Sequence, residues 1–93
     1  TWTDEAERWL RDIFDYIATD NPTAAARTVD GIYENAQVLT TFPEIGHRYF
    51  ASARTVRILH YGHYRIAYLI QADGNIDILG VFHGALDIER FNL

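Results

Sequence analysis

The sequence contains no cysteine, no methionine and no lysine among its 93 residues. Without cysteine the chain forms no disulfide and has no thiol nucleophile, which is typical of a reducing compartment. No hydrophobic run approaches the roughly 20 residues that a membrane-spanning helix needs, and no secretory signal pattern is present. We therefore expect a cytoplasmic protein without a membrane partner.

Positive charge is scarce in the first part of the chain. Residues 1–41 carry eight acids against three arginines, whereas residues 42–93 carry five acids, five arginines and all four histidines. The formal net charge is −5. Because strong nucleic-acid binders are usually basic, we expect no direct DNA binding by this chain without a partner, although a local basic face in the second half stays open.

What the sequence does have is enough apolar surface for one core. Hydrophobic residues make up 48% of the chain, which suits a single domain over residues 1–93. Residues 3–19 predict a helix, because Ala6, Leu10 and Ile13 recur at three- and four-residue spacing. A second helix is predicted from Pro22 to about residue 41, and the short link predicts an antiparallel helical hairpin.

The hydrophobic period changes to two in the second half of the chain. Residues 42–53 are interpreted as a loop, and residues 55–61, 63–71 and 76–83 predict a three-stranded antiparallel meander. Asp73 and Gly74 supply the hairpin turn before the last strand. The predicted fold class is α+β, with the helical hairpin packed on one face of a small antiparallel sheet.

Alternation along the strands predicts which residues face the helices. We assign the set that begins with Val56 and Ile58 and ends with Phe82 to the helix side. The opposite set mixes arginines with aliphatic residues, which predicts a groove with an apolar floor that another chain covers. The residues of this floor are Leu59, Leu69, Leu79 and Val81.

Four segments, taken in order, resemble one family over essentially the whole chain. They are "WTDEAERWLRDIFDYIATDNPTAAAR", "LTTFPEIGHRY", "VRILHYGHYRIAYLI" and "IDILGVFHGALDIER". The sequence resembles the RelE/ParE superfamily of toxins from bacterial type II toxin–antitoxin modules. The resemblance implies an N-terminal strand that lies mostly upstream of Thr1, and we also expect a short helical segment at the C-terminus.

The pieces "DNP", "FPEIG" and "VFHG" are most similar to the ParE branch. Membership of that branch implies an inhibitor of DNA gyrase that a cognate antitoxin neutralises. Leu86 and His47 stand where the family usually has arginines, and Arg48 is placed to replace the second of these. The candidate target-binding residues are Arg48, Arg57, Arg65, His83 and Arg90.

The resemblance leaves an enzymatic alternative open, a ribosome-dependent mRNA endonuclease of the RelE type. Its chemistry needs a base for the 2′-hydroxyl, cations for the phosphate and an acid for the leaving oxygen. The residues for these roles would be Arg65, His83, Arg57 and Glu44. The lack of lysine and the acidic net charge favour the gyrase inhibitor, which is not an enzyme.

Two further alternatives remain, one for the function of the chain and one for the role of its arginines. The chain could instead be a non-enzymatic adaptor domain, and Arg57 and Arg65 could be structural, pairing with Asp77 on the neighbouring strand. The four histidines match no metal-binding spacing, so we expect neither a metal nor another cofactor.

Overall fold

Two helices form the first half of the chain in the computed structural model, which describes residues 1–50 and 54–83. Helix α1 spans Asp4–Ala18, and the Thr3 side chain caps it by accepting a hydrogen bond from the Ala6 N–H at 3.2 Å. Helix α2 spans Pro22–Gln37 and is capped by Asn21. A 3₁₀ turn, η1, follows at Val38–Thr40. Neither helix is long and apolar enough to cross a membrane.

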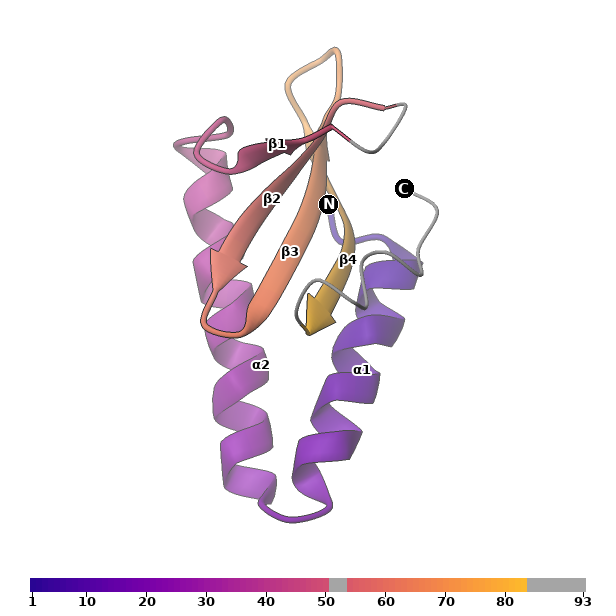
Figure 1. Ribbon diagram of the computed structural model, residues 1–93, viewed down its shortest axis with the longest axis vertical. Helices are drawn as coiled ribbons and strands as arrows, with labels where there is room; N and C mark the ends of the chain where they lie inside the picture. The colour runs from indigo at the N-terminus through magenta and orange to yellow at the C-terminus, as the bar shows by residue number, and fades with distance from the viewer. Residues whose placement is uncertain (51–53, 84–93) are drawn as a thin grey trace.

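The second half of the chain forms a four-stranded antiparallel sheet in the order β1-β2-β3-β4 (Figure 1). Strands β2, β3 and β4 span Val56–Tyr61, Tyr64–Ile70 and Ile76–His83. The two helices lie side by side and pack on one face of this sheet. The predicted α+β class is therefore confirmed.

Strand β1, His47–Tyr49, was not predicted from the sequence, which indicated a loop over residues 42–53. The strand pairs with β2 through the register His47 opposite Ile58 and Tyr49 opposite Val56. Three residues with two exposed side chains are too short and too polar to show a period of two. The sheet therefore has one strand more than the predicted meander.

The free edge of β4 is occupied in part by the first residues of the chain. Trp2 forms an isolated parallel bridge with Ile78. The Ile78 N–H donates to the Thr1 carbonyl at 2.8 Å, and the Thr3 N–H donates to the Ile78 carbonyl at 3.2 Å. An extended N-terminal segment thus runs beside β4, where a strand upstream of Thr1 was expected. The expected C-terminal helical segment lies outside the described residues.

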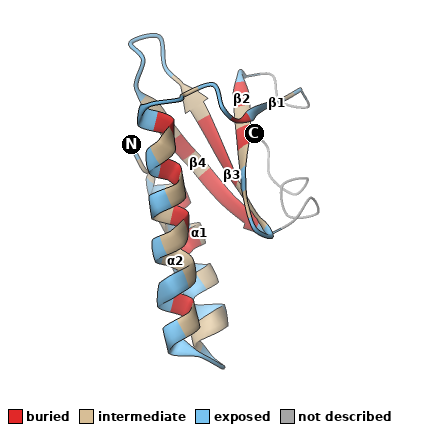
Figure 2. Ribbon diagram, turned by 90° about the vertical axis from the view of Figure 1, so that its left-hand side faces the viewer, coloured by how far each residue is buried: buried red, intermediate tan, exposed pale blue. Residues whose placement is uncertain are grey.

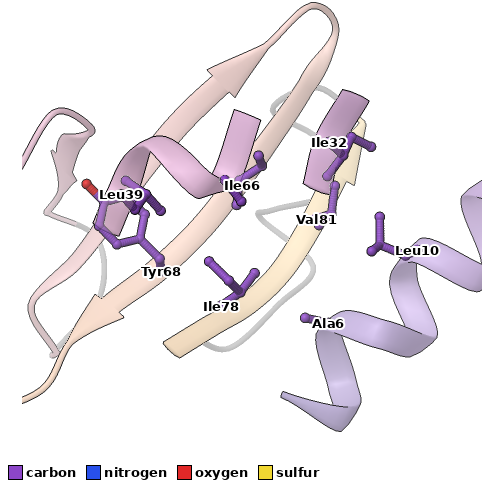
Figure 3. Packing of buried hydrophobic residues seen from close by; sticks show 9 residues of the cluster. Ala6, Leu10, Ile32, Leu39, Ile66, Tyr68, Ile78 and Val81 are labelled. Atoms are coloured by element: carbon purple, nitrogen blue, oxygen red, sulfur yellow. The ribbon is translucent and has the colours of Figure 1, made fainter. Parts of the chain in front are cut away.

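The main core lies between the helices and the sheet (Figure 3). We call this side of the sheet the helix-side face and the opposite side the far face. The helix-side cluster is made of Ala6, Leu10, Ile32, Ala36, Leu39, Ile66, Tyr68, Ile78 and Val81. A second buried cluster occupies the far face, and its members are Val56, Ile58, Ala67 and Phe82. Figure 2 shows buried residues along both helices and the strands.

The predicted division of the strand residues between the two faces was right for β3 and partly wrong elsewhere. On β2 the assignment is reversed, since Leu59 and Tyr61 pack on the helix-side cluster while Val56 and Ile58 lie on the far face. Because both faces are buried, apolar alternation alone did not distinguish them.

A β-bulge reverses the faces in the middle of β4. Ala67 of β3 lies opposite Gly80 but Tyr68 lies opposite Ile78, so that Leu79 has no partner in the register. An extra residue of this kind shifts the alternation by one. Val81 consequently points into the helix-side core and Phe82 to the far face, the opposite of the prediction.

Candidate functional site

Arg57 fixes the loop between η1 and β1. Its Nη1 donates hydrogen bonds to the Gly46 carbonyl at 2.8 Å and to the Glu44 carbonyl at 3.3 Å. The structural alternative of an ion pair between Arg57 and Asp77 is wrong, because Arg57 lies opposite Tyr68 on the helix-side face and Asp77 lies opposite Leu69 on the far face. The Asp77 carboxylate accepts a hydrogen bond from Gln71 Nε2 at 2.5 Å. Glu44 itself is exposed and contributes its backbone oxygen to this arrangement.

Tyr68 holds the same loop from the core side. Its buried hydroxyl donates to the Pro43 carbonyl at 2.7 Å and accepts from the Gly46 N–H at 3.0 Å. Burial raises the pKa of this phenol above its usual value. Sequence reasoning treated Tyr68 as a core residue and missed this role, because no local pattern connects residues 43 and 68.

A group of basic side chains lies on the far face near the β2–β3 turn. The rings of His47 and His60 are 5.0 Å apart between centroids, and Arg65 lies opposite His60 in the register. Burial, then the charge of Arg65, then His47 lower the pKa of His60 below the usual histidine value of 6.5. The charged form of His60 is therefore disfavoured beside the Arg65 guanidinium.

His83 ends β4 on the helix-side face, at the same end of the sheet as that group. Its ring is 5.3 Å from the Tyr64 ring and 6.1 Å from the His63 ring. It borders a cavity of about 310 Å³ whose lining includes Trp9 and Ile13 of α1. The four histidines thus form two pairs, and the described part of the chain contains no group of three or more His, Asp or Glu residues that could hold a metal ion.

The residues that the endonuclease alternative requires are not brought together. Arg65 lies on the far face beside Phe82, whereas His83 shares the helix-side face with Tyr64. Arg57 pairs with residue 68 and His83 with residue 64, a separation of four residues or about 13 Å along β3. The guanidinium of Arg57 is also occupied by the loop carbonyls.

Of the two remaining candidate target-binding residues, the structure describes Arg48 but not Arg90. Arg48 lies opposite Arg57 on β1, is exposed, and holds its guanidinium carbon 5.2 Å from the centroid of the Phe50 ring. Arg90 lies outside the described residues.

The four aliphatic residues predicted to form one apolar floor are divided between the two faces. Val81 is fully buried in the helix-side cluster, and Leu59 packs against the same cluster. Leu69 and Leu79 are half-buried against the far-face cluster. The prediction of a single floor is therefore wrong, for the reasons given above for β2 and for the bulge in β4.

Comparison with known proteins identifies the family. Residues 1–88 match the family described as "ParE toxin of type II toxin-antitoxin system, parDE". The chain belongs to this family of ParE toxins. The predicted resemblance to the RelE/ParE superfamily, and to its ParE branch, is confirmed by this match over nearly the whole sequence.

A solved structure of the "Chromosomal ParDE TA system from P. aeruginosa" has the same fold as this ParE toxin. The TM-score is 0.75, and the match covers 90% of this chain and 92% of that chain at 23% sequence identity. A search of curated proteins finds no match. The fold of this solved structure thus agrees with the family match of the chain.

Proposed function

We propose that this ParE toxin inhibits DNA gyrase in the cytoplasm through protein–protein contact and is neutralised by a cognate antitoxin. The family match over residues 1–88 supports a toxin of this type. The observation that carries the choice of a protein target over mRNA cleavage is the separation of Arg57, Arg65 and His83.

The geometry works against cleavage for a direct reason. Attack of a 2′-hydroxyl on the neighbouring phosphate needs the base, the acid and the stabilising cations within hydrogen-bond reach of one phosphate group. Side chains on opposite faces of a sheet, or about 13 Å apart along a strand, do not meet this requirement. Arg57 instead holds the loop before β1 through the Glu44 and Gly46 carbonyls, and Arg65 lies on the far face opposite His60.

Two assays run on the same purified toxin distinguish the targets. We expect it to inhibit DNA supercoiling by gyrase and to leave mRNA intact on programmed ribosomes. Cleavage of ribosome-bound mRNA without inhibition of gyrase would show that the endonuclease alternative is correct. Inactivity in both assays would contradict the proposed target.

The antitoxin contact is proposed for the far face, at Leu69 and Leu79. Both side chains are half-buried and extend the far-face cluster toward solvent. Because each side chain is already half-buried, covering the two leucines contributes about 0.8–1.5 kcal/mol each before ordering costs. Val81 is withdrawn from this surface because it is fully buried in the helix-side core.

Calorimetry with the cognate antitoxin tests this contact. Replacing both Leu69 and Leu79 by Asp should weaken binding at least about 100-fold, with the fold checked by circular dichroism. Phe14→Asp on α1 is the matched control and should bind normally. Unchanged affinity of the folded double variant would remove the far face from the antitoxin interface.

A further inference from the structure

The turn between η1 and β1 exposes two large apolar side chains. Phe42 is 58% exposed and Ile45 is 55% exposed. Together with Pro43 and their neighbours they line a hollow of about 470 Å³ on the surface of the turn. Figure 1 shows this connection beside β1, at the end of the sheet away from the β2–β3 turn.

The turn is held rigidly by groups on both sides of it. The Phe42 N–H donates to the Val38 carbonyl at 2.8 Å, and the Ile45 N–H donates to the Phe42 carbonyl at 3.1 Å. Pro43 occupies the second position of this four-residue turn, which suits its fixed φ. The hydrogen bonds of Tyr68 and Arg57 described above then fix the carbonyls of residues 43, 44 and 46.

Gly46 allows the turn to lie this close to the sheet. A Cβ at this position would lie 2.7 Å from the Ile58 carbonyl oxygen and 2.7 Å from the Tyr68 hydroxyl oxygen. The backbone of the turn is therefore packed against β2 and β3, while its two largest side chains point outward.

A rigid turn with two exposed apolar side chains does not stabilise the free protein, but it does favour the binding of a partner. Exposed apolar side chains on a rigid loop gain nothing from the hydrophobic effect in the free protein. A partner gains from them because little conformational entropy is lost when a preformed loop binds. Apolar anchors on rigid loops with a hollow beside them are typical of interface hot spots.

The charge around the turn indicates the chemistry of the partner. Arg57 donates hydrogen bonds to the Glu44 and Gly46 carbonyls beside the turn, whereas the Glu44 side chain is an exposed carboxylate within the turn. Arg48 is exposed two residues after Gly46. A complementary surface would offer an apolar side chain for the hollow and a carboxylate for the Arg48 guanidinium.

We propose that the Phe42–Ile45 turn is the surface with which the toxin docks on its target protein, at a site with an apolar side chain beside a carboxylate. This inference rests on the proposed function in that the target is a protein. The antitoxin has been assigned to Leu69 and Leu79 on the far face, which leaves the turn for the second partner. The hollow and its apolar rim favour a protein over a nucleic acid.

The test compares Phe42→Ser/Ile45→Ser with the wild-type toxin in three measurements: growth arrest on expression without antitoxin, inhibition of gyrase supercoiling, and antitoxin affinity. Phe14→Ser on α1 is the matched control, since this aromatic side chain is 36% exposed, is distant in sequence from the turn and does not line the cavity beside His83. Circular dichroism and urea unfolding check that each variant is folded.

We expect the double variant to lose at least about 30-fold in gyrase inhibition, to arrest growth weakly, and to bind antitoxin normally, while Phe14→Ser behaves like the wild type. Full toxicity of the folded double variant would overturn the inference. Loss of antitoxin binding with toxicity retained would overturn it as well, by assigning the turn to the other partner.

The growth measurement separates this inference from the proposed function. If wild-type toxin arrests growth without inhibiting gyrase, the proposed target is wrong, and the double variant still decides whether the turn contacts the true target. Direct DNA binding by the wild type that the double variant loses would overturn the assignment of a protein partner.

Discussion

The two faces of the sheet are both buried at their centres, but they are built differently. The helix-side face packs on α1 and α2 through a cluster that includes Ile66 and Ile78. Among the described residues, the far-face cluster has four buried members, contacts Trp9 of α1 through Phe82, and is bordered by His47, His60 and Arg65. The helix-side face is an ordinary hydrophobic core, whereas the far face has a small core next to the Arg65 guanidinium and two histidines. Charge and apolar surface thus meet on the far face.

Truncating a buried side chain on either face should have the largest effect on the free energy of unfolding. Phe82→Ala on the far face should lower the free energy of unfolding by about 3–5 kcal/mol, and Ile66→Ala on the helix-side face by about 2–5 kcal/mol. Both side chains are fully buried. Urea unfolding measures the change, with the partly exposed Phe14→Ala as control. A loss below about 1 kcal/mol for Phe82→Ala alone would show that the far-face cluster is not a core.

Tyr68→Phe should have a smaller effect on stability. It keeps the ring in the helix-side core but leaves the buried Gly46 N–H without its acceptor and removes the donor to the Pro43 carbonyl. The expected loss is about 1–3 kcal/mol in urea unfolding. Gyrase inhibition should also weaken, because the turn that carries Phe42 loses two of its supports. Unchanged stability would mean that water replaces the hydroxyl without cost.

The smallest effect concerns pH and the basic side chains of the far face. Because the pKa of His60 is lower in the folded chain than the usual histidine value of 6.5, the unfolded chain takes up this proton first as the pH falls. The contribution of His60 to stability is complete above about pH 7.5 and is lost as the pH falls through 6.5 toward the folded pKa. His60→Gln should flatten this part of the stability profile, measured by urea unfolding from pH 8 to pH 5. An unchanged slope would show that the environment of His60 does not disfavour its charged form.

The helices and three of the strands were predictable because their signals are local. Caps at Thr3 and Asn21 and the period of the apolar residues place the helix boundaries within a few residues of those observed. The face assignment of β3 was also right, since Ile66 and Tyr68 lie in the helix-side core.

The candidate site was harder to predict because its determinants are not local. Nothing near Leu79 in the sequence indicates a bulge, which depends on how β4 matches β3. The link between Tyr68 and the Pro43 carbonyl joins residues 25 apart. Predicted groups such as Arg57 with His83 failed for the same reason, because residue type and strand parity do not give the position along the sheet.

The most direct test of the central claim, that the toxin binds its target and does not cleave RNA, is growth arrest by His83→Gln expressed without antitoxin. The exposed His83 borders the cavity beside Tyr64 but lies apart from Arg57. Loss of one hydrogen bond costs about 1 kcal/mol, or about fivefold, so we predict that the variant remains toxic. Loss of 100-fold or more, the size expected for a missing acid–base group, in a folded variant that still binds its antitoxin would contradict the account.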